Sequence, residues 1–336
     1  MTVLITGGLG YIGSHTVVEL MEQDEDCLII DNLSKSTIDV LSRVESIVHK
    51  EVRFLEMDLL DIHALHTVFA HNEISAVIHF AGFKSVGESV ANPLMYYQNN
   101  LISTLNLLEI MQTFDVKNLV FSSSATVYGD LHTPPLKEEL SLSAPNPYGS
   151  TKLMLEQVLN DIAVADDSWR IALMRYFNPI GAHTSGELGE MPHGIPNNLM
   201  PHLLNAADGE TDKLRIFGGD YDTADGSCVR DFIHIMDLAK GHVQALKYVK
   251  THNGCEAFNL GTGIGYSVLD LIHTFEEVNN VRIPYEIVGR REGDIVTSVA
   301  DVSKANRLLD WRTQYDLKDM CDATWKWYKA NKKAYT

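Results

Sequence analysis

The chain has 336 residues, of which 45% are hydrophobic and 21% are charged, so it can bury a large core and form two lobes. It carries 45 Asp and Glu against 27 Lys and Arg, a formal charge of −18. Such an acidic surface repels nucleic-acid phosphates and anionic lipids, so we expect neither a nucleic acid nor a membrane as partner. Any anionic ligand must be held by local positive groups.

The apolar stretches are all shorter than the roughly 20 residues of a membrane helix, and the chain begins on a strand-like segment without room for a signal peptide. We therefore expect a cytoplasmic protein. The four cysteines form no CxxC pair, which argues against a zinc site or a disulfide framework, and we expect no metal.

A glycine-rich turn follows the first apolar run. Residues 3–6 read as a strand, glycines follow at 7, 8, 10 and 13, and an apolar helical pattern continues through Met21. This turn would place backbone N–H groups and the positive end of a helix dipole where a pyrophosphate can sit. The spacing GxxGxxG of Gly7, Gly10 and Gly13 is a weak signal alone, because such a turn can also serve only to pack a helix on a strand.

The position of an acidic residue strengthens the dinucleotide interpretation. A second apolar run, 27–30, ends in Asp31, 18 residues beyond Gly13, where a ribose-binding carboxylate is expected in a βαβ unit. An acid there favours an unphosphorylated ribose, and hence NAD over NADP.

Strand and helix patterns then alternate as far as residue 177. Strands are predicted at 52–56, 76–80 and 118–121, and helices at 62–69, 93–114 and 147–166. This alternation predicts an α/β fold with a parallel, doubly wound, Rossmann-like sheet, whose ligands collect beyond the carboxyl ends of the strands. Asp58 lies at one such end, and it is equally consistent with an adenine ligand and with the cap of the next helix.

A tyrosine and a lysine open the helix at 147–166. Tyr148 and Lys152 are four residues apart and share a helix face, and Ser124 follows a neighbouring strand. Lowering the pKa of a phenol from about 10 to about 7 requires roughly 4 kcal/mol of stabilisation of the phenolate relative to the phenol. A nearby ammonium group, together with the positive charge of a nicotinamide ring, can supply it. On spacing alone, two ordinary helix-surface side chains explain the pair at least as well.

Several longer motifs resemble the extended short-chain dehydrogenase/reductase superfamily and, within it, the UDP-galactose 4-epimerases. The first and fourth of these motifs are typical of the whole superfamily, and the later ones are more specific. They are Thr6–Thr16, His79–Lys84, Phe121–Gly129, Tyr148–Lys152, Arg175–Pro179, Gly194–Pro201, Val229–His234 and Arg290–Asp294.

This resemblance implies roles for individual residues in the first lobe. Tyr148 would be the catalytic acid and base at the sugar O4, Lys152 would tune it and bind the nicotinamide ribose, and Ser124 would hydrogen-bond the same hydroxyl. NAD would also contact the glycine turn and residues near the strand ends, namely Tyr11, Ile12, Asp31, Asn32, Asp58, Leu59, Phe80, Ala81, Gly82, Lys84, Asn99 and Phe177.

A smaller C-terminal α/β lobe, 178–336, is expected to bind the substrate, with a return of about 237–262 to the NAD-binding lobe 1–177. By resemblance, Arg230 and Arg291 would clamp the diphosphate of a UDP-hexose and Asp294 would bind the uridine ribose. The remaining lining would come from Asn178, Asn198, Leu199, Ile216 and Phe217. Without the resemblance, surface salt bridges would be the preferred explanation of these charged residues.

The expected activity is inversion at C4 of the hexose by transient oxidation with tightly bound NAD. A 4,6-dehydratase on the same scaffold is the nearest alternative, but its extra Asp-Glu pair is replaced here by Ala125 and Thr126. A non-catalytic NAD-binding regulator is a third, although it would not need Tyr148 and Lys152.

Two further expectations concern substrate range and assembly. Ser298 stands where some relatives carry a bulky Tyr beside the C2 substituent of the sugar, so the pocket would also admit N-acetylated UDP-sugars, unless Ser298 faces elsewhere. The resemblance also implies a homodimer, with the helices near 93–114 and 147–166 packing against a partner, although burial within one chain explains their periodicity as well.

Overall fold

A seven-stranded parallel sheet is the centre of the molecule. The computed structural model describes residues 1–191, 198–291 and 294–332. The strand order is β11-β6-β5-β4-β1-β2-β3, and every neighbouring pair is parallel. The strands are β1 Thr2–Thr6, β2 Asp26–Asp31, β3 Arg53–Glu56, β4 Ile74–His79, β5 Asn118–Ser124, β6 Arg170–Tyr176 and β11 Gly254–Leu260. The predicted Rossmann-like, doubly wound fold is confirmed.

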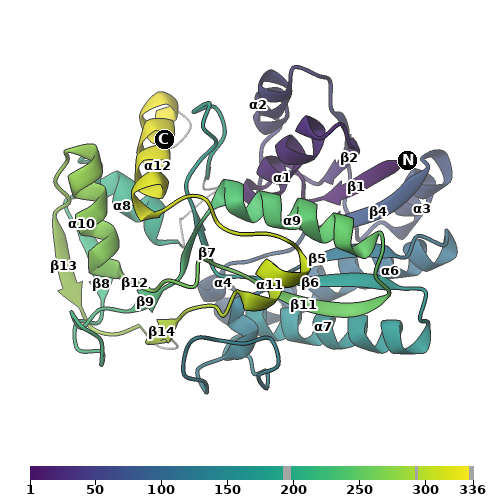
Figure 1. Ribbon diagram of the computed structural model, residues 1–336. Helices are drawn as coiled ribbons and strands as arrows, with labels where there is room; N and C mark the ends of the chain where they lie inside the picture. Colours follow the sequence, from purple (N-terminus) through teal and green to yellow (C-terminus); the bar gives the residue numbers. More distant parts are fainter. Residues whose placement is uncertain (192–197, 292–293, 333–336) are drawn as a thin grey trace.

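Helices cover both faces of this sheet (Figure 1). On one face α1 (Tyr11–Glu22), α2 (Asp39–Val48) and α9 (Ile235–Val249) share a buried apolar cluster with the strands. On the other face α3 (Ile62–His71), α6 (Ser103–Thr113) and α7 (Pro147–Ala165) enclose a second cluster. Because both faces are covered, the central strands are continuous apolar runs, as in Thr2–Thr6, where every residue is buried.

The segment predicted as one long helix at 93–114 is built from three pieces. They are α5 (Pro93–Tyr97), a π-helical turn (Gln98–Ile102) and α6, and they follow the short α4 (Val86–Ala91). The predicted helical stretch is confirmed over 93–113, and only the π-turn in its middle was not predicted. The π-turn brings the buried Asn100 to the loop that follows β4, where it bonds both backbone groups of Phe83.

The remainder of the chain forms short strands and helices beside the carboxyl edge of the sheet (Figure 1). The small sheets pair β10 (Phe232–His234) with β7 (Asn178–Ile180), β13 (Tyr285–Val288) with β8 (Leu214–Phe217), and β9 (Val229–Arg230) with β12 (Tyr266–Ser267) and β14 (Thr297–Ser298). The helices are α8 (Leu199–Ala207), α10 (Val268–Asn279), α11 (Ser303–Leu308) and α12 (Leu317–Asn331), with a 3₁₀ turn at Ala125–Tyr128 after β5.

The chain returns to the large sheet after β10. Helix α9 contributes to the apolar cluster around α1, and β11 pairs with β6 over its full length, from Gly254 opposite Arg170 to Leu260 opposite Tyr176. This is the stretch for which a return was expected, and the division into lobes at 177/178 stays a prediction. No helix in the described residues is long and apolar enough to cross a bilayer.

Candidate active site

The glycine turn between β1 and α1 has space only for glycines. Gly7 has a φ of +67°, and a Cβ there would lie 2.7 Å from the backbone N of Ala81. A Cβ on Gly13 would lie 2.4 Å from the carbonyl oxygen of Gly7. In the described chain, no side chain caps the amino end of α1 at Gly10. A positive helix end beside a bare backbone turn is the arrangement that binds a pyrophosphate.

Asp31 lies beside this turn, as predicted from its spacing. Its carboxylate is buried and accepts hydrogen bonds from the backbone N–H of Leu9 (3.1 Å), from Leu33 (3.0 Å) and from the hydroxyl of Ser36 (2.9 Å). Three donors hold the carboxylate at the carboxyl end of β2. It is therefore fixed in orientation and close enough to the glycines to share one ligand with them.

Asp58 does not cap the next helix. Asp61 caps α3, accepting from the N–H groups of His63 and Ala64. Asp58 instead accepts from the side-chain amide of Asn32 at 2.9 Å and from the N–H of Leu60. Asn32 and Asp58, which are both predicted to contact NAD, therefore touch one another, and the cap interpretation of Asp58 was wrong.

Other predicted cofactor residues lie along the loop after β4. The ring of Phe80 packs against His242, and Gly82 has a φ of +152° beside the side chain of Asn100. Asn99 donates to Asn100 at 3.0 Å. Asn100, which sequence reasoning missed, also donates to Thr151 on α7 at 3.1 Å, so it joins this loop to the helix of Tyr148. Leu59 and Phe177 are buried, and Tyr11 donates to the carbonyl of Gly181 at 2.7 Å.

Tyr148, Lys152 and Ser124 converge at the carboxyl end of β5. Lys152 donates from Nζ to the carbonyl oxygen of Ser122 at 2.6 Å, and all three side chains are buried. A Pro at the first helical position and the cap by Asn146 fix the start of α7 and so place Tyr148 in its first turn. Ser124 lies close enough to Tyr148 to act on its ionisation.

Burial dominates the ionisation of these groups. It raises the pKa of Tyr148, while the hydroxyl of Ser124 acts in the opposite direction. Burial lowers the pKa of Lys152 to about 8, and Glu156 opposes this shift. The expected lowering of the pKa of the phenol is therefore not a property of the chain alone, and a further positive charge beside Tyr148 is needed to achieve it.

The predicted substrate residues are grouped around the small sheets. Arg230 on β9 lies opposite Ser298 on β14 in parallel register, so the two side chains lie on the same face of that sheet. Arg291 pairs with Asp294 at 2.6 Å and lies over the ring of Phe217 at 5.5 Å.

The other predicted substrate residues differ in their burial and in their hydrogen-bond partners. Ile216 is 2% exposed and packs in the core of this part of the chain, so its side chain is not available to a ligand. Asn198 donates to Glu190 at 2.8 Å, and Lys84 lies 3.6 Å from the same carboxylate. Leu199 opens α8, and the N–H of Asn178 donates to the carbonyl of Asp231 at 3.0 Å. Residues 194–197 and 292–293 of the quoted motifs lie outside the described residues.

Asp231 is a buried site residue that spacing did not reveal. Its carboxylate accepts hydrogen bonds from the N–H and hydroxyl groups of Thr262 and from the N–H groups of Gly263 and Ala300, at 2.7 to 3.1 Å. It therefore ties the loops after β11 and β14 to β9. The sequence did contain an indication of it, because Asp231 directly follows Arg230, which is predicted to bind the diphosphate.

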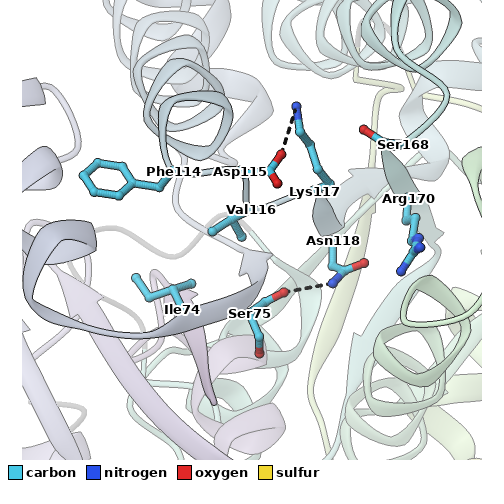
Figure 2. Close-up of a pocket in the computed structure, with 9 residues that line it drawn as sticks. All are labelled: Ile74, Ser75, Phe114, Asp115, Val116, Lys117, Asn118, Ser168 and Arg170. Carbon is cyan, nitrogen blue, oxygen red and sulfur yellow. Dashed lines mark hydrogen bonds and ion pairs between the residues drawn. The ribbon is translucent and has the colours of Figure 1, made fainter.

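The pocket in Figure 2 lies at the opposite edge of the sheet, at the amino ends of β4, β5 and β6. Its charged side chains are engaged within the chain: Lys117 with Asp166 at 3.0 Å, and Arg170 with Asn253 at 2.9 Å. Since ligands of doubly wound sheets bind beyond the carboxyl ends, we assign this pocket no part in the site.

Comparison with known proteins agrees with this geometry. A family model described as GDP-mannose 4,6 dehydratase matches residues 4–324. A UDP-glucose 4-epimerase of Bacillus subtilis is 54% identical, over 100% of this chain and 99% of the relative. The chain belongs to the UDP-glucose 4-epimerase family. Members of this family are isomerases.

Solved structures of the family match along the whole chain. A UDP-glucose 4-epimerase from Bifidobacterium longum, in complex with NAD⁺ and UDP, has a TM-score of 0.96 at 48% identity and covers 100% of both chains. One from Stenotrophomonas maltophila, with bound NAD and formylated UDP-arabinopyranose, has a TM-score of 0.97 at 47% identity and covers 99% of both chains. The epimerase interpretation is therefore favoured over a dehydratase or a regulator.

Proposed function

We propose that the chain interconverts UDP-galactose and UDP-glucose by transient oxidation at C4 of the hexose, with NAD as its resident cofactor. The observation that carries this proposal is the convergence of Tyr148, Ser124 and Lys152 at the same edge of the sheet as the glycine turn. Solved relatives hold NAD together with UDP or a UDP-sugar derivative, which supports the choice of ligands.

The residues present fit NAD. Gly7 and Gly13 leave the backbone bare where a pyrophosphate would lie, and Asp31 is fixed at the end of β2 for a ribose. Bound NAD supplies a reversible hydride acceptor and a positive charge. The cluster of Asn32 with Asp58 is suited to the adenosine end, and Lys152 to the ribose at the other end.

Tyr148 acts as base and then as acid. Its phenolate oxygen takes the proton of O4 while the secondary alcohol is oxidised to the 4-keto sugar, and the resulting phenol returns the proton to O4 when the ketone is reduced from its other face. Ser124 holds the same hydroxyl by a hydrogen bond. The ammonium group of Lys152 stabilises the phenolate form of Tyr148.

The hexose has to turn over between the two half-reactions, so its own contacts must be weak. We infer that binding energy lies in the nucleotide, where the forks of Arg230 and Arg291 engage the diphosphate and Asp294 the ribose. Arg291 is paired with Asp294 at 2.6 Å, and this pair would open when a diphosphate binds.

One assay separates this activity from the alternatives. Purified protein is mixed with UDP-galactose without added NAD, and products are identified by chromatography and mass spectrometry. UDP-glucose supports the proposal, a 4-keto-6-deoxy sugar would indicate the dehydratase, and no product would indicate the regulator. Ala125 and Thr126 lack the carboxyl groups that dehydration needs, and Thr126 donates its hydroxyl to Ser124 at 2.9 Å.

The phenol of Tyr148 can be tested directly with Tyr148→Phe. Because general acid–base catalysis contributes about 10²- to 10⁴-fold, we expect kcat to fall by that factor. The ring stays in place, so the thermal midpoint and the content of bound NAD should be unchanged. Full activity of this variant would contradict the assigned role.

We further propose a homodimer and a cytoplasmic location. Exposed apolar side chains lie on the consecutive helices α4 to α7, which suits burial against a second copy of the chain; they are Val90, Leu94, Met95, Ile102, Leu105 and Met154. The four cysteines are free thiols, which suits a reducing compartment.

A further inference from the structure

A buried ion pair lies behind the catalytic helix. Glu156 on α7 and Arg175 on β6 are 1% and 4% exposed, and Nη2 of Arg175 lies 2.6 Å from Oε2 of Glu156. Nε of the same guanidinium contacts both carboxylate oxygens, at 3.0 and 3.2 Å. Glu156 follows Lys152 by one helical turn, so the two side chains lie on the same face of α7.

The carboxylate reaches the strand end on which the catalytic residues depend. Glu156 accepts a hydrogen bond from the hydroxyl of Ser123 on β5 at 2.5 Å. The two neighbours of Ser123 each serve the active site, because the carbonyl of Ser122 holds Lys152 and the hydroxyl of Ser124 acts on Tyr148. Glu156 thus fixes the middle member of three consecutive serines.

Arg175 is anchored on the side away from Glu156. Nη1 donates to the hydroxyl of Tyr128 at 3.1 Å and to the carbonyl of Glu138 at 3.0 Å. The hydroxyl of Tyr128 donates in turn to Asn259 on β11 at 2.6 Å. The guanidinium is therefore held in place by groups other than Glu156, and its position does not depend on that carboxylate alone.

Among the described residues, only a few charged or titratable groups lie around Lys152. Tyr148 and Glu156 lie on its own helix, and Arg175 lies on β6 behind Glu156. On β4, burial lowers the pKa of His79 to about 3, so that ring is neutral at physiological pH. Tyr128, Tyr176 and Cys255 are also nearby, and burial raises the pKa of each, which keeps them neutral as well.

We propose that Glu156 is a positioning residue of the epimerase: with Arg175 as counter-ion, it holds the 122–124 strand end, and with it the carbonyl group that anchors Lys152, against α7. This inference rests on the proposed function, because Lys152 matters only if Tyr148 must act as a base. The hydrogen bond positions Ser123, and the negative charge favours the ammonium form of Lys152.

Two charge variants give opposite expectations. Glu156→Gln leaves Arg175 unpaired, so Lys152 loses its proton at lower pH and the alkaline limb of kcat moves down by about half a pH unit or more. Arg175→Met leaves the carboxylate unpaired, and the limb moves up. The double variant should return near the wild-type profile. Shifts in the same direction, or lower kcat with unchanged profiles, would overturn the electrostatic role.

A second readout does not depend on turnover. The Cε resonance of Lys152, in protein labelled with ¹³C-lysine and assigned from its absence in Lys152→Met, is titrated in the wild type and both charge variants. Its midpoint should fall in Glu156→Gln and rise in Arg175→Met. If the wild type does not convert UDP-galactose, the proposed function fails, while this titration still decides the inference.

The positioning role has its own test, which also serves if the charge variants do not fold. Ser123→Ala removes one hydroxyl, and we expect kcat to fall about tenfold with KM for UDP-galactose unchanged. The control is Ser89→Ala, because Ser89 is equally buried and its hydroxyl donates to the carbonyl of Val86 on its own helix, α4. Equal kcat values for the two variants would show that Ser123 positions nothing.

Discussion

At the scale of single residues, burial decides which groups of the site carry charge. His79 bridges the hydroxyls of Thr6 and Thr104 between β1 and α6, and with its pKa lowered to about 3 it acts as a neutral hydrogen-bonding group. Lys152 retains a pKa of about 8 in equally buried surroundings, with Glu156 opposing the effect of burial. Of these two buried groups, Lys152 is therefore the one that can carry a positive charge near Tyr148.

Glu19 on α1 gives a prediction for stability against pH. Burial raises its pKa from 4.5 to about 7, with Lys240 acting against the shift. The folded chain holds this proton more tightly than the unfolded chain does. The resulting contribution of Glu19 to the free energy of unfolding is fully present below pH 4.5 and is lost as the pH rises toward 7. Glu19→Gln should therefore increase the unfolding free energy at pH 8, by roughly 1 to 3 kcal/mol, and change it little at pH 4.5.

Urea unfolding of wild type and Glu19→Gln at the two pH values measures this difference. A stability gain of the same size at both pH values would show that the ionisation of Glu19 is not its cause.

Ser298 gives a prediction for substrate range. It is 8% exposed and lies beside Arg230, so a small side chain is packed next to a proposed diphosphate ligand. We expect the wild type to convert UDP-N-acetylgalactosamine, and Ser298→Tyr to lose that activity while converting UDP-galactose. Initial rates with both sugars measure this. Equal loss of both would indicate a general disturbance of β14 rather than a role in specificity.

At the scale of elements, the long apolar patterns were predictable and the local exceptions were not. The strands β1, β2, β4 and β5 and the helix α7 followed from their apolar patterns, because each buries a full run or stripe, whereas β6 was not among the predicted strands. The π-turn at Gln98–Ile102 was missed, because a single extra residue in a helix leaves the apolar spacing almost unchanged. Asp58 was considered as the cap of α3, whereas Asp61, which was not considered, directly precedes the helix and caps it.

Sequence also indicated Tyr148 and Lys152 by spacing, yet it passed over Glu156, which continues the same four-residue interval on α7. The reason is physical: a carboxylate at that interval is usually solvated, and only the fold shows that Arg175 meets it in the interior.

The glycine turn provides a test at this scale. A Cβ on Gly13 would lie 2.4 Å from the oxygen of Gly7, so Gly13→Ala must displace the turn. Overpacking of this kind costs about 1–3 kcal/mol. Because the displaced turn loses its fit to the pyrophosphate, we expect a loss of similar size in binding free energy, which is about 5- to 150-fold in NAD affinity. Bound NAD per chain and calorimetric titration of NAD measure the effect.

Gly87 in α4 is the matched control, because a Cβ there would have no neighbour within 4 Å. Gly87→Ala should bind NAD as the wild type does and gain about 0.5–1 kcal/mol of stability from the better helix former. Unchanged NAD binding in Gly13→Ala would remove the turn from the proposed cofactor site.

At the scale of the whole molecule, the doubly wound sheet was predictable, and the small sheets formed after residue 177 were not. Their strands are two to four residues long, too short for a period to be recognised, and their pairing is decided by contacts distant in sequence, such as those of Asp231. Patterns in the sequence located the predicted substrate residues only through family resemblance.

The proposed dimer can be tested with one charge. Leu94 is 68% exposed on α5, and burying a carboxylate there against a second copy would be costly, so Leu94→Glu should shift the sedimentation coefficient to that of a monomer. Ile287→Glu, at a 52% exposed site on β13, should leave assembly unchanged. A wild type that sediments as a monomer would refute the dimer.

The pairing of β11 with β6 bears on how this scaffold can be recombined. In a chimera with a single crossover near residue 178, the N-terminal half would have to pack against β11 and α9 of another protein. The contacts along Gly254–Leu260 and Ile235–Val249 would then no longer be the native ones. A chimera in which only 178–234 and the segment after 260 are exchanged keeps the native contacts of α9 and β11. Transplanting sugar specificity between relatives therefore calls for two inserts rather than one crossover.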